Sequence, residues 1–146
     1  MVYFGFKSYE NQLIKEVLDN SKKDPIELIK SFSPVPEDEI GSINAISSCE
    51  MFFSEEAYTY KIYWGLIIYF FENNLDFIIE NKWLKIALLL FGHLEKEIIE
   101  DEFLNKNWLS SQRRKHTLQE ERNMIINKIK SNDEITKLTP LNIRVI

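Results

Sequence analysis

Apolar residues recur every three to four positions along most of the chain, the spacing that places them on one face of an α-helix. Between residues 9 and 22, Leu13, Ile14, Val17 and Leu18 form one such stripe. The charged residues of this segment fall on the opposite side. The pattern predicts a first amphipathic helix over 9–22.

The next two helices are indicated by their first turns. Residues 24–27 are Asp-Pro-Ile-Glu, which supply an N-cap acid, a proline at the first helical position and a glutamate at the third. The prolines at 34 and 36 cannot continue this helix, so we expect it to end near Phe32. Glu37, Asp38 and Glu39 then lie where the positive end of another helix dipole would be, ahead of isoleucines at helical spacing.

Two strongly apolar segments follow. The first runs over 54–71 from a capping serine, Ser54, and its second half is apolar on every side. The second runs over 83–103, and Lys85 is its only charged residue before His93. A helix that is apolar all round has to be surrounded by others. We therefore expect these two helices to form the centre of the fold and to pack antiparallel.

The last third of the chain predicts one more long helix, over 110–130. Its apolar content is lower, with Leu118, Ile125 and Ile129 on one side, so we expect it on the outside. Pro140 is expected to stop any helix that follows. The extended-type segments 2–6 and 141–146 could pair as a small two-stranded β-ribbon. Together the patterns predict a mainly α, single-domain helical bundle of about five to six helices over residues 1–146.

Composition is consistent with a packed helical domain. Of the 146 residues 45% are hydrophobic, and only four glycines and four prolines interrupt the pattern. The single cysteine, Cys49, excludes an intramolecular disulfide, and the first residues lack the features of a signal peptide, so we expect a cytoplasmic protein. The longest uncharged apolar run, 62–71, is about half the length that a bilayer requires, so we expect no membrane anchor.

Charge is distributed unevenly along the chain, whose net charge is −5. Residues 1–104 carry 19 acids and 9 bases, whereas residues 105–146 carry 4 acids and 9 bases. Concentrated negative charge on a helix favours association with a basic partner, although a solvated helix face has the same composition. The candidate partner-binding acids are Glu95, Glu97, Glu100, Asp101 and Glu102, with Glu37, Asp38 and Glu39 as a second patch.

The basic C-terminal helix allows an alternative, binding to nucleic acid. Guanidinium groups match phosphate oxygens, and the residues that would make such contacts are Arg113, Arg114, Lys115, His116 and Arg122. No aromatic residues are interleaved with this cluster for base stacking. A solvated helix face is the simpler interpretation of the pattern.

Catalytic, metal and cofactor motifs are absent from the sequence. His93 and Glu97 are four residues apart, which suits a shared metal, but no second Glu-x-x-His pair accompanies them. Nothing near Cys49 resembles a nucleophile loop, and no glycine-rich phosphate loop or Cys-x-x-Cys occurs. We therefore expect no catalytic residue, no metal and no cofactor.

The chain resembles bacterial toxin-immunity proteins in overall character, because it is small, acidic, rich in helices and aromatic residues, and free of motifs. The resemblance implies a non-enzymatic inhibitor that neutralises a nuclease-type toxin by covering its basic surface in a one-to-one complex. A phage inhibitor of host defence has the same physical requirements and remains a further alternative.

Overall fold

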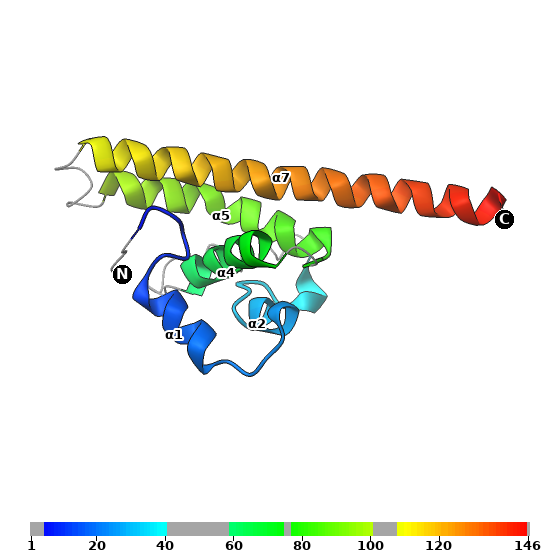
Figure 1. Ribbon diagram of the computed structural model, residues 1–146, viewed down its shortest axis with the longest axis horizontal. Helices are drawn as coiled ribbons and strands as arrows, with labels where there is room; N and C mark the ends of the chain where they lie inside the picture. The colour runs from blue at the N-terminus through cyan, green and yellow to red at the C-terminus, as the bar shows by residue number, and fades with distance from the viewer. Residues whose placement is uncertain (1–4, 41–58, 75–76, 101–107, 146) are drawn as a thin grey trace.

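The computed structural model describes residues 5–40, 59–74, 77–100 and 108–145, and it is mainly helical (Figure 1). Within the two longest helices, the described side chains are those of residues 81–96 and 111–134. The elements in chain order are α1 (Gln12–Asn20), α2 (Pro25–Ser31), the short 3₁₀ helix η1 (Glu37–Glu39), α4 (Thr59–Asn73), α5 (Asn81–Glu100) and α7 (Trp108–Val145). The predicted mainly α fold class is confirmed.

Both N-terminal helices begin at side-chain caps. The Asn11 side chain accepts a hydrogen bond from the Ile14 amide at 2.9 Å, and that of Asp24 accepts one from the Glu27 amide at 2.9 Å. The Asp-Pro-Ile-Glu start of α2 is thus confirmed. The first helix begins at Gln12 and ends at Asn20, inside the expected range 9–22.

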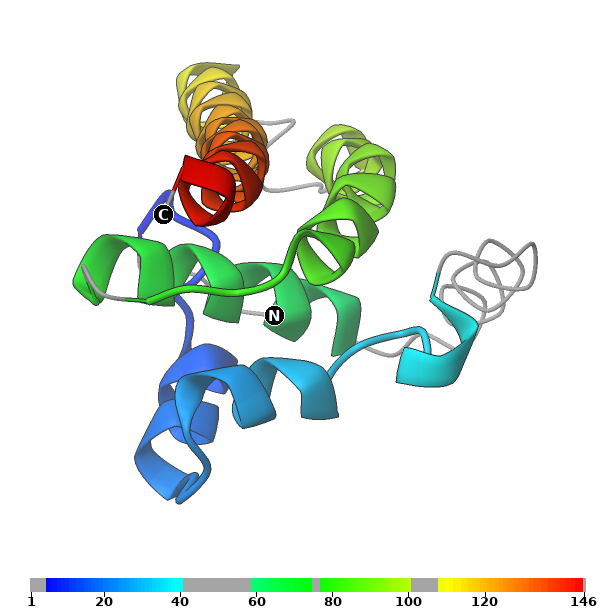
Figure 2. The ribbon, with the colours of Figure 1, turned by 90° about the vertical axis from the view of Figure 1, so that its right-hand side faces the viewer.

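The helices are arranged in three layers (Figure 2). Helices α5 and α7 lie side by side and antiparallel in one layer (Figures 1 and 2). Helix α4 forms the middle layer, and α1 and α2 cover its other side. Every residue from Ile62 to Ile68 of α4 is buried, which confirms its place at the centre. We expected α4 to be antiparallel to α5; instead it runs across the α5–α7 pair (Figure 2). Its all-round apolar surface is covered by this pair on one side and by α1 and α2 on the other.

Helix α7 contributes more to the core than its composition suggests. Leu118 and Ile125 are 1% and 0% exposed, and Ile129 packs against the core, so the predicted stripe is confirmed. The helix continues through Pro140 to Val145, so the expected stop there is wrong. A proline removes one backbone hydrogen bond, but its φ of about −65° is that of a helix. Because 141–145 are helical, the possible ribbon with 2–6 is not formed.

The acids Glu37, Asp38 and Glu39 form a single 3₁₀ turn, and residues 41–58, which include Ser54 and Cys49, lie outside the described part of the chain. In the described ranges no helix has both the length and the apolar composition to cross a bilayer.

Candidate functional site

A buried polar cluster joins the N-terminal segment to helices α4 and α7. We call it the Glu121 network; it consists of Ser8, Asn11, Trp64, Arg114 and Glu121, which are all nearly inaccessible to solvent. One carboxylate is its centre. The Ser8 amide donates to Glu121 Oε2 at 2.9 Å, and Glu121 Oε1 accepts from the Ser8 hydroxyl at 2.5 Å and from Trp64 Nε1 at 3.0 Å.

Arg114 supplies the positive charge of the network. Its Nη1 lies 3.7 Å from Glu121 Oε1 and donates to the main-chain oxygen of Phe6 at 2.9 Å, while Nη2 donates to Ser8 Oγ at 2.9 Å. The Asn11 amide group donates to the Ser8 main-chain oxygen at 2.9 Å. Since each of these polar atoms has a partner inside the protein, the network is suited to holding the N-terminal segment in place rather than to chemistry on a substrate.

The sequence builds this network through two local features. Among residues 111–134 of α7, whose side chains are described, the buried positions in order are Ser111, Arg114, Leu118, Glu121 and Ile125. They are three or four residues apart, so charged and apolar residues share one buried seam. On α4, a Cβ atom at Gly65 would lie 2.9 Å from the Ser8 main-chain oxygen and 2.9 Å from Ile14 Cδ1, so only glycine lets the segment come this close.

A second group of hydrogen bonds holds the N-terminal segment to Glu72, near the end of α4. Glu72 Oε2 accepts from Lys7 Nζ at 2.6 Å and from the Tyr9 hydroxyl at 2.5 Å. The hydrogen bond to Glu72 raises the pKa of Lys7. Burial, followed by the hydrogen bond to Glu72, raises the pKa of Tyr9. Both groups keep their protons at neutral pH, so both can donate to Glu72 at that pH.

The basic cluster of α7 is largely engaged within the protein. The Arg113 guanidinium lies 4.3 Å from the centre of the Phe6 ring, and that of Arg122 lies 5.2 Å from the centre of the Phe91 ring. Arg114 is 6% exposed, which corrects its assignment as a phosphate contact, because a guanidinium turned into the core cannot reach a nucleic-acid backbone. The expectation failed because a charged residue in a helix pattern is normally assigned to the outside.

Arg113 is exposed in spite of its contact with Phe6, and the two remaining basic candidates are also at or near the surface. His116 is exposed, and its Nε2 lies 2.6 Å from Glu120 Oε1, one helical turn further along α7. Lys115 is half-buried. The five residues thus do not form one outward-facing basic surface.

The acidic candidates fall into two separate places. Glu37 pairs with Lys82 at 3.1 Å and with Lys30 at 3.9 Å, and the hydrogen bond from Lys82 lowers the pKa of the Glu37 carboxyl. Asp38 is exposed and Glu39 is half-buried. Glu95 is exposed near the other end of α5, roughly 20 Å from Lys82 at 1.5 Å per helical residue.

The structure does not describe the side chains of the remaining acidic candidates. Glu97 and Glu100 belong to α5, but their side chains lie outside the described part, as do Asp101 and Glu102 altogether. Within the described residues, no three histidine, cysteine, aspartate or glutamate side chains are grouped to hold a metal ion. His93 is half-buried and makes an interaction of its own.

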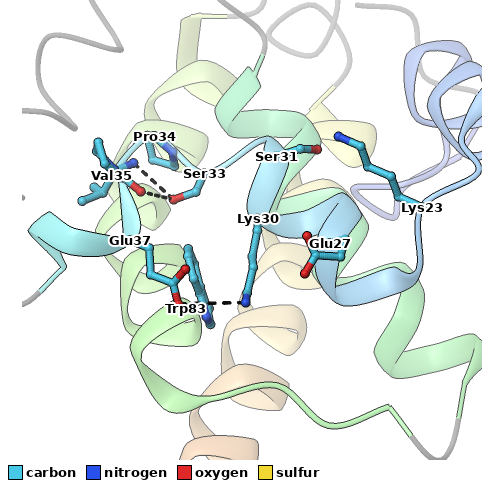
Figure 3. A pocket seen from close by; sticks show the side chains of 10 residues that line it. Lys23, Glu27, Lys30, Ser31, Ser33, Pro34, Val35, Glu37 and Trp83 are labelled. Carbon is cyan, nitrogen blue, oxygen red and sulfur yellow. Dashed lines mark hydrogen bonds and ion pairs between the residues drawn. The ribbon is translucent and has the colours of Figure 1, made fainter.

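Sequence reasoning missed an open pocket of about 470 Å³ beside α2 and the start of α5 (Figure 3). Its lining includes Lys30 and Val35, two prolines, Glu37, and the Trp83 ring, which is 2% exposed. The sequence pattern assigned Trp83 to the core, which is correct. Nothing in the pattern indicated that the ring also forms a wall of a pocket.

No protein-family model, curated protein or solved structure matches this chain. The fold and the network define a mainly helical protein in which a buried ion pair fastens the N-terminal segment to the helix layers. What the domain does has to be argued from its own surface.

Proposed function

We propose that this chain is a protein-binding inhibitor that covers a basic surface of its partner in a one-to-one complex, as bacterial immunity proteins do with nuclease-type toxins. The observation that carries the proposal is the charge of the surface. Among described residues classed as exposed, 11 are acidic and 7 are basic, whereas the whole chain has 23 acids and 18 bases. The exposed acids are Glu16, Asp19, Asp24, Glu27, Glu37, Asp38, Glu80, Glu95, Glu120, Asp133 and Glu134.

The acidic excess of the surface has a physical cause. Arg114 is inside the protein, and Arg122 is half-buried against an aromatic ring. The buried Arg114 is balanced by the buried Glu121, so the excess comes from the half-buried groups. Among the described residues, seven lysines and arginines are half-buried, Arg122 among them, against three acids. A negative surface accelerates the approach of a basic partner and disfavours acidic ones.

The same observation disfavours nucleic acid as the partner. Binding to nucleic acid draws its affinity from several lysine or arginine contacts to phosphates. Here three of the four arginines, Arg113, Arg114 and Arg122, contact groups of the protein itself. An inhibitor of a host defence protein would use the same acidic surface, and the two kinds of inhibitor differ only in the partner.

The first test is genetic. The product of each adjacent reading frame is expressed in a bacterial host with and without this chain. We expect one of these products to be toxic, growth to be rescued by the chain, and the two proteins to co-purify in equal amounts. Absence of both rescue and complex formation for both neighbours would contradict the immunity role.

The second test addresses the surface. In the purified pair, Glu95→Lys and Asp38→Lys should slow association several-fold at low salt, because they reverse charges that steer a basic partner. Glu16→Lys, which makes the same change at an exposed site on α1, is the matched control. Stopped-flow association rates at two salt concentrations measure the effect. Equal rates for all three variants would show that the acids at these two places do not face the partner.

A further inference from the structure

Trp83 has a polar atom without a partner. Its indole Nε1 is shielded from solvent and is the one buried side-chain nitrogen or oxygen without a hydrogen bond in the described part of the chain. The Tyr63 hydroxyl donates to the Trp83 main-chain oxygen at 2.6 Å, and the residue is 2% exposed. Buried donors in native proteins nearly always have an acceptor, so an unpaired one calls for an explanation.

Trp83 lines a pocket, and two lysine ammonium groups lie near its ring. Lys30 Nζ lies 5.5 Å and Lys82 Nζ 5.6 Å from the centre of the Trp83 ring. Figure 3 shows the nitrogen-bearing end of the ring at the same end of the pocket as the tips of Lys30 and Glu37. A donor that lacks an acceptor and a lysine that lines the same pocket are thus directed to one region.

The neighbouring hydroxyl groups are already engaged in local bonds. Ser31 Oγ donates to the Leu28 main-chain oxygen at 2.6 Å, and Ser33 Oγ donates to the Val35 main-chain oxygen at 2.8 Å. The Val35 side chain and two prolines form an apolar wall of the pocket. A volume of about 470 Å³ is within the range of small-molecule sites, which combine apolar walls with a few convergent polar groups.

We propose that this pocket binds a small carboxylate, with one carboxylate oxygen accepting from Trp83 Nε1 and the other from Lys30 Nζ. A monoanion fits better than a phosphate, because Glu27 and Glu37 also line the pocket and repel a dianion more strongly. Glu37 controls access to the site, and we call it the gate, because its carboxylate competes with the ligand for Lys30. Its side chain is 54% exposed, it holds Lys30 and Lys82 in the empty pocket, and it turns outward as the ligand carboxylate takes its place. The proposal does not rest on the inhibitory role, and Glu37 belongs both to this pocket and to the exposed acids described above.

The test follows the Trp83 indole N–H signal in ¹H–¹⁵N spectra of the full chain. The signal is assigned by side-chain correlation and by its absence in Trp83→Phe. Benzoate and acetate are the probes, with inorganic phosphate and sodium chloride for comparison. We expect either carboxylate to shift the Trp83 signal downfield and saturably, since the N–H gains an acceptor. The Trp64 signal, whose N–H is already bonded to Glu121, should stay unchanged.

Three variants locate the binding site. Lys30→Met should weaken carboxylate binding roughly tenfold, the size expected for the loss of one charge-assisted hydrogen bond. Glu37→Gln should tighten it, because the competing carboxylate is removed. Lys85→Met, which removes an exposed lysine of α5 that does not line the pocket, is the matched control and should bind as the parent does.

Several results would overturn the proposal. These are a Trp83 signal that does not move with either carboxylate, one that moves equally with sodium chloride, and one that responds to phosphate alone. Weaker binding by Glu37→Gln would equally contradict it, because the gate would then be a ligand contact. Each variant is first checked for its parent-like helix content by circular dichroism, and Glu37→Gln, at an exposed site, tests the proposal even where Lys30→Met does not fold.

Discussion

Glu121 carries the most consequential prediction for stability. Replacing it with leucine puts an apolar side chain of similar size at this buried position of α7. The replacement removes the carboxylate that accepts from three donors and pairs with Arg114. The matched control is Glu120→Leu. Glu120 is the preceding residue on the same helix and is exposed, so the two variants have the same helix propensity and differ in what the carboxylate contacts.

The expected magnitude follows from what is left behind. Removing one partner of a buried ion pair costs about 3–5 kcal/mol, because the other charge stays buried without compensation. The Ser8 amide and the Trp64 indole also lose their acceptor. For Glu120→Leu only an exposed pair with His116 is lost, so we expect about 0.5 kcal/mol or less. A difference of that size between neighbouring glutamates is a large fraction of the stability of a typical domain.

The assay is equilibrium unfolding in urea, followed by circular dichroism at a helix band and by tryptophan fluorescence. Coincident curves establish two-state behaviour, and the midpoint at constant slope then gives the change in the free energy of unfolding. In thermal unfolding, Glu121→Leu should lower the Tm by roughly 10 °C or more.

A double variant separates charge from packing. In Arg114→Met with Glu121→Leu both charges are gone, so no uncompensated ion remains in the core, and we expect the double variant to be more stable than Glu121→Leu alone. Two results would refute the reasoning. One is a loss of stability for Glu121→Leu no larger than that for Glu120→Leu. The other is a double variant whose loss equals the sum of the two single losses.

Two further predictions concern close packing and pH. Gly65→Ala should destabilise the protein by about 1–3 kcal/mol, because its Cβ meets a main-chain oxygen at 2.9 Å, whereas Gly92→Ala, which meets nothing within 4 Å, should stabilise α5 by up to about 1 kcal/mol; urea midpoints of the two variants decide this. The pKa of the Glu37 carboxyl should lie below its ordinary 4.5, so its contribution to stability is present above pH 4.5 and is lost as the pH falls through the lowered value. A carboxyl NMR titration measures this pKa, and Lys82→Met should move it back toward 4.5; an unchanged pKa would show that Lys82 is not the cause.

Sequence periodicity and capping were sufficient to predict most of the helices. The N-cap at Asp24, the apolar centre in α4 and the stripe of α7 follow from the order and spacing of side chains, which determine where a helix begins and which of its residues share a face. The crossing of α4 over α5 could not be predicted in this way. Two helices that are each apolar on a wide face can pack at several angles, and the choice depends on the whole set of neighbours.

The buried network was missed for a different reason. Arg114 and Glu121 occupy the same spacing as Leu118 and Ile125, but a charged residue is normally assigned to solvent, because burying an isolated charge is costly. Only the tertiary fold shows that the two charges meet. A weak signal existed in the sequence: two opposite charges seven residues apart lie on one side of a helix, in register with its apolar stripe.

The Glu121 network also constrains the order in which the protein can form. Ser8 and Glu121 are separated by 113 positions, whereas most contacts of a helical domain are between near neighbours in the chain. During synthesis, the residues of α1, α4 and α5 are all made before Glu121, which accepts the hydrogen bonds of Ser8. Until then the Ser8 amide and the Trp64 indole have no carboxylate to bind. The hydrogen bonds of Ser8 to Glu121 are therefore among the last of the fold to form, whereas the contacts of Lys7 and Tyr9 with Glu72 need only α4.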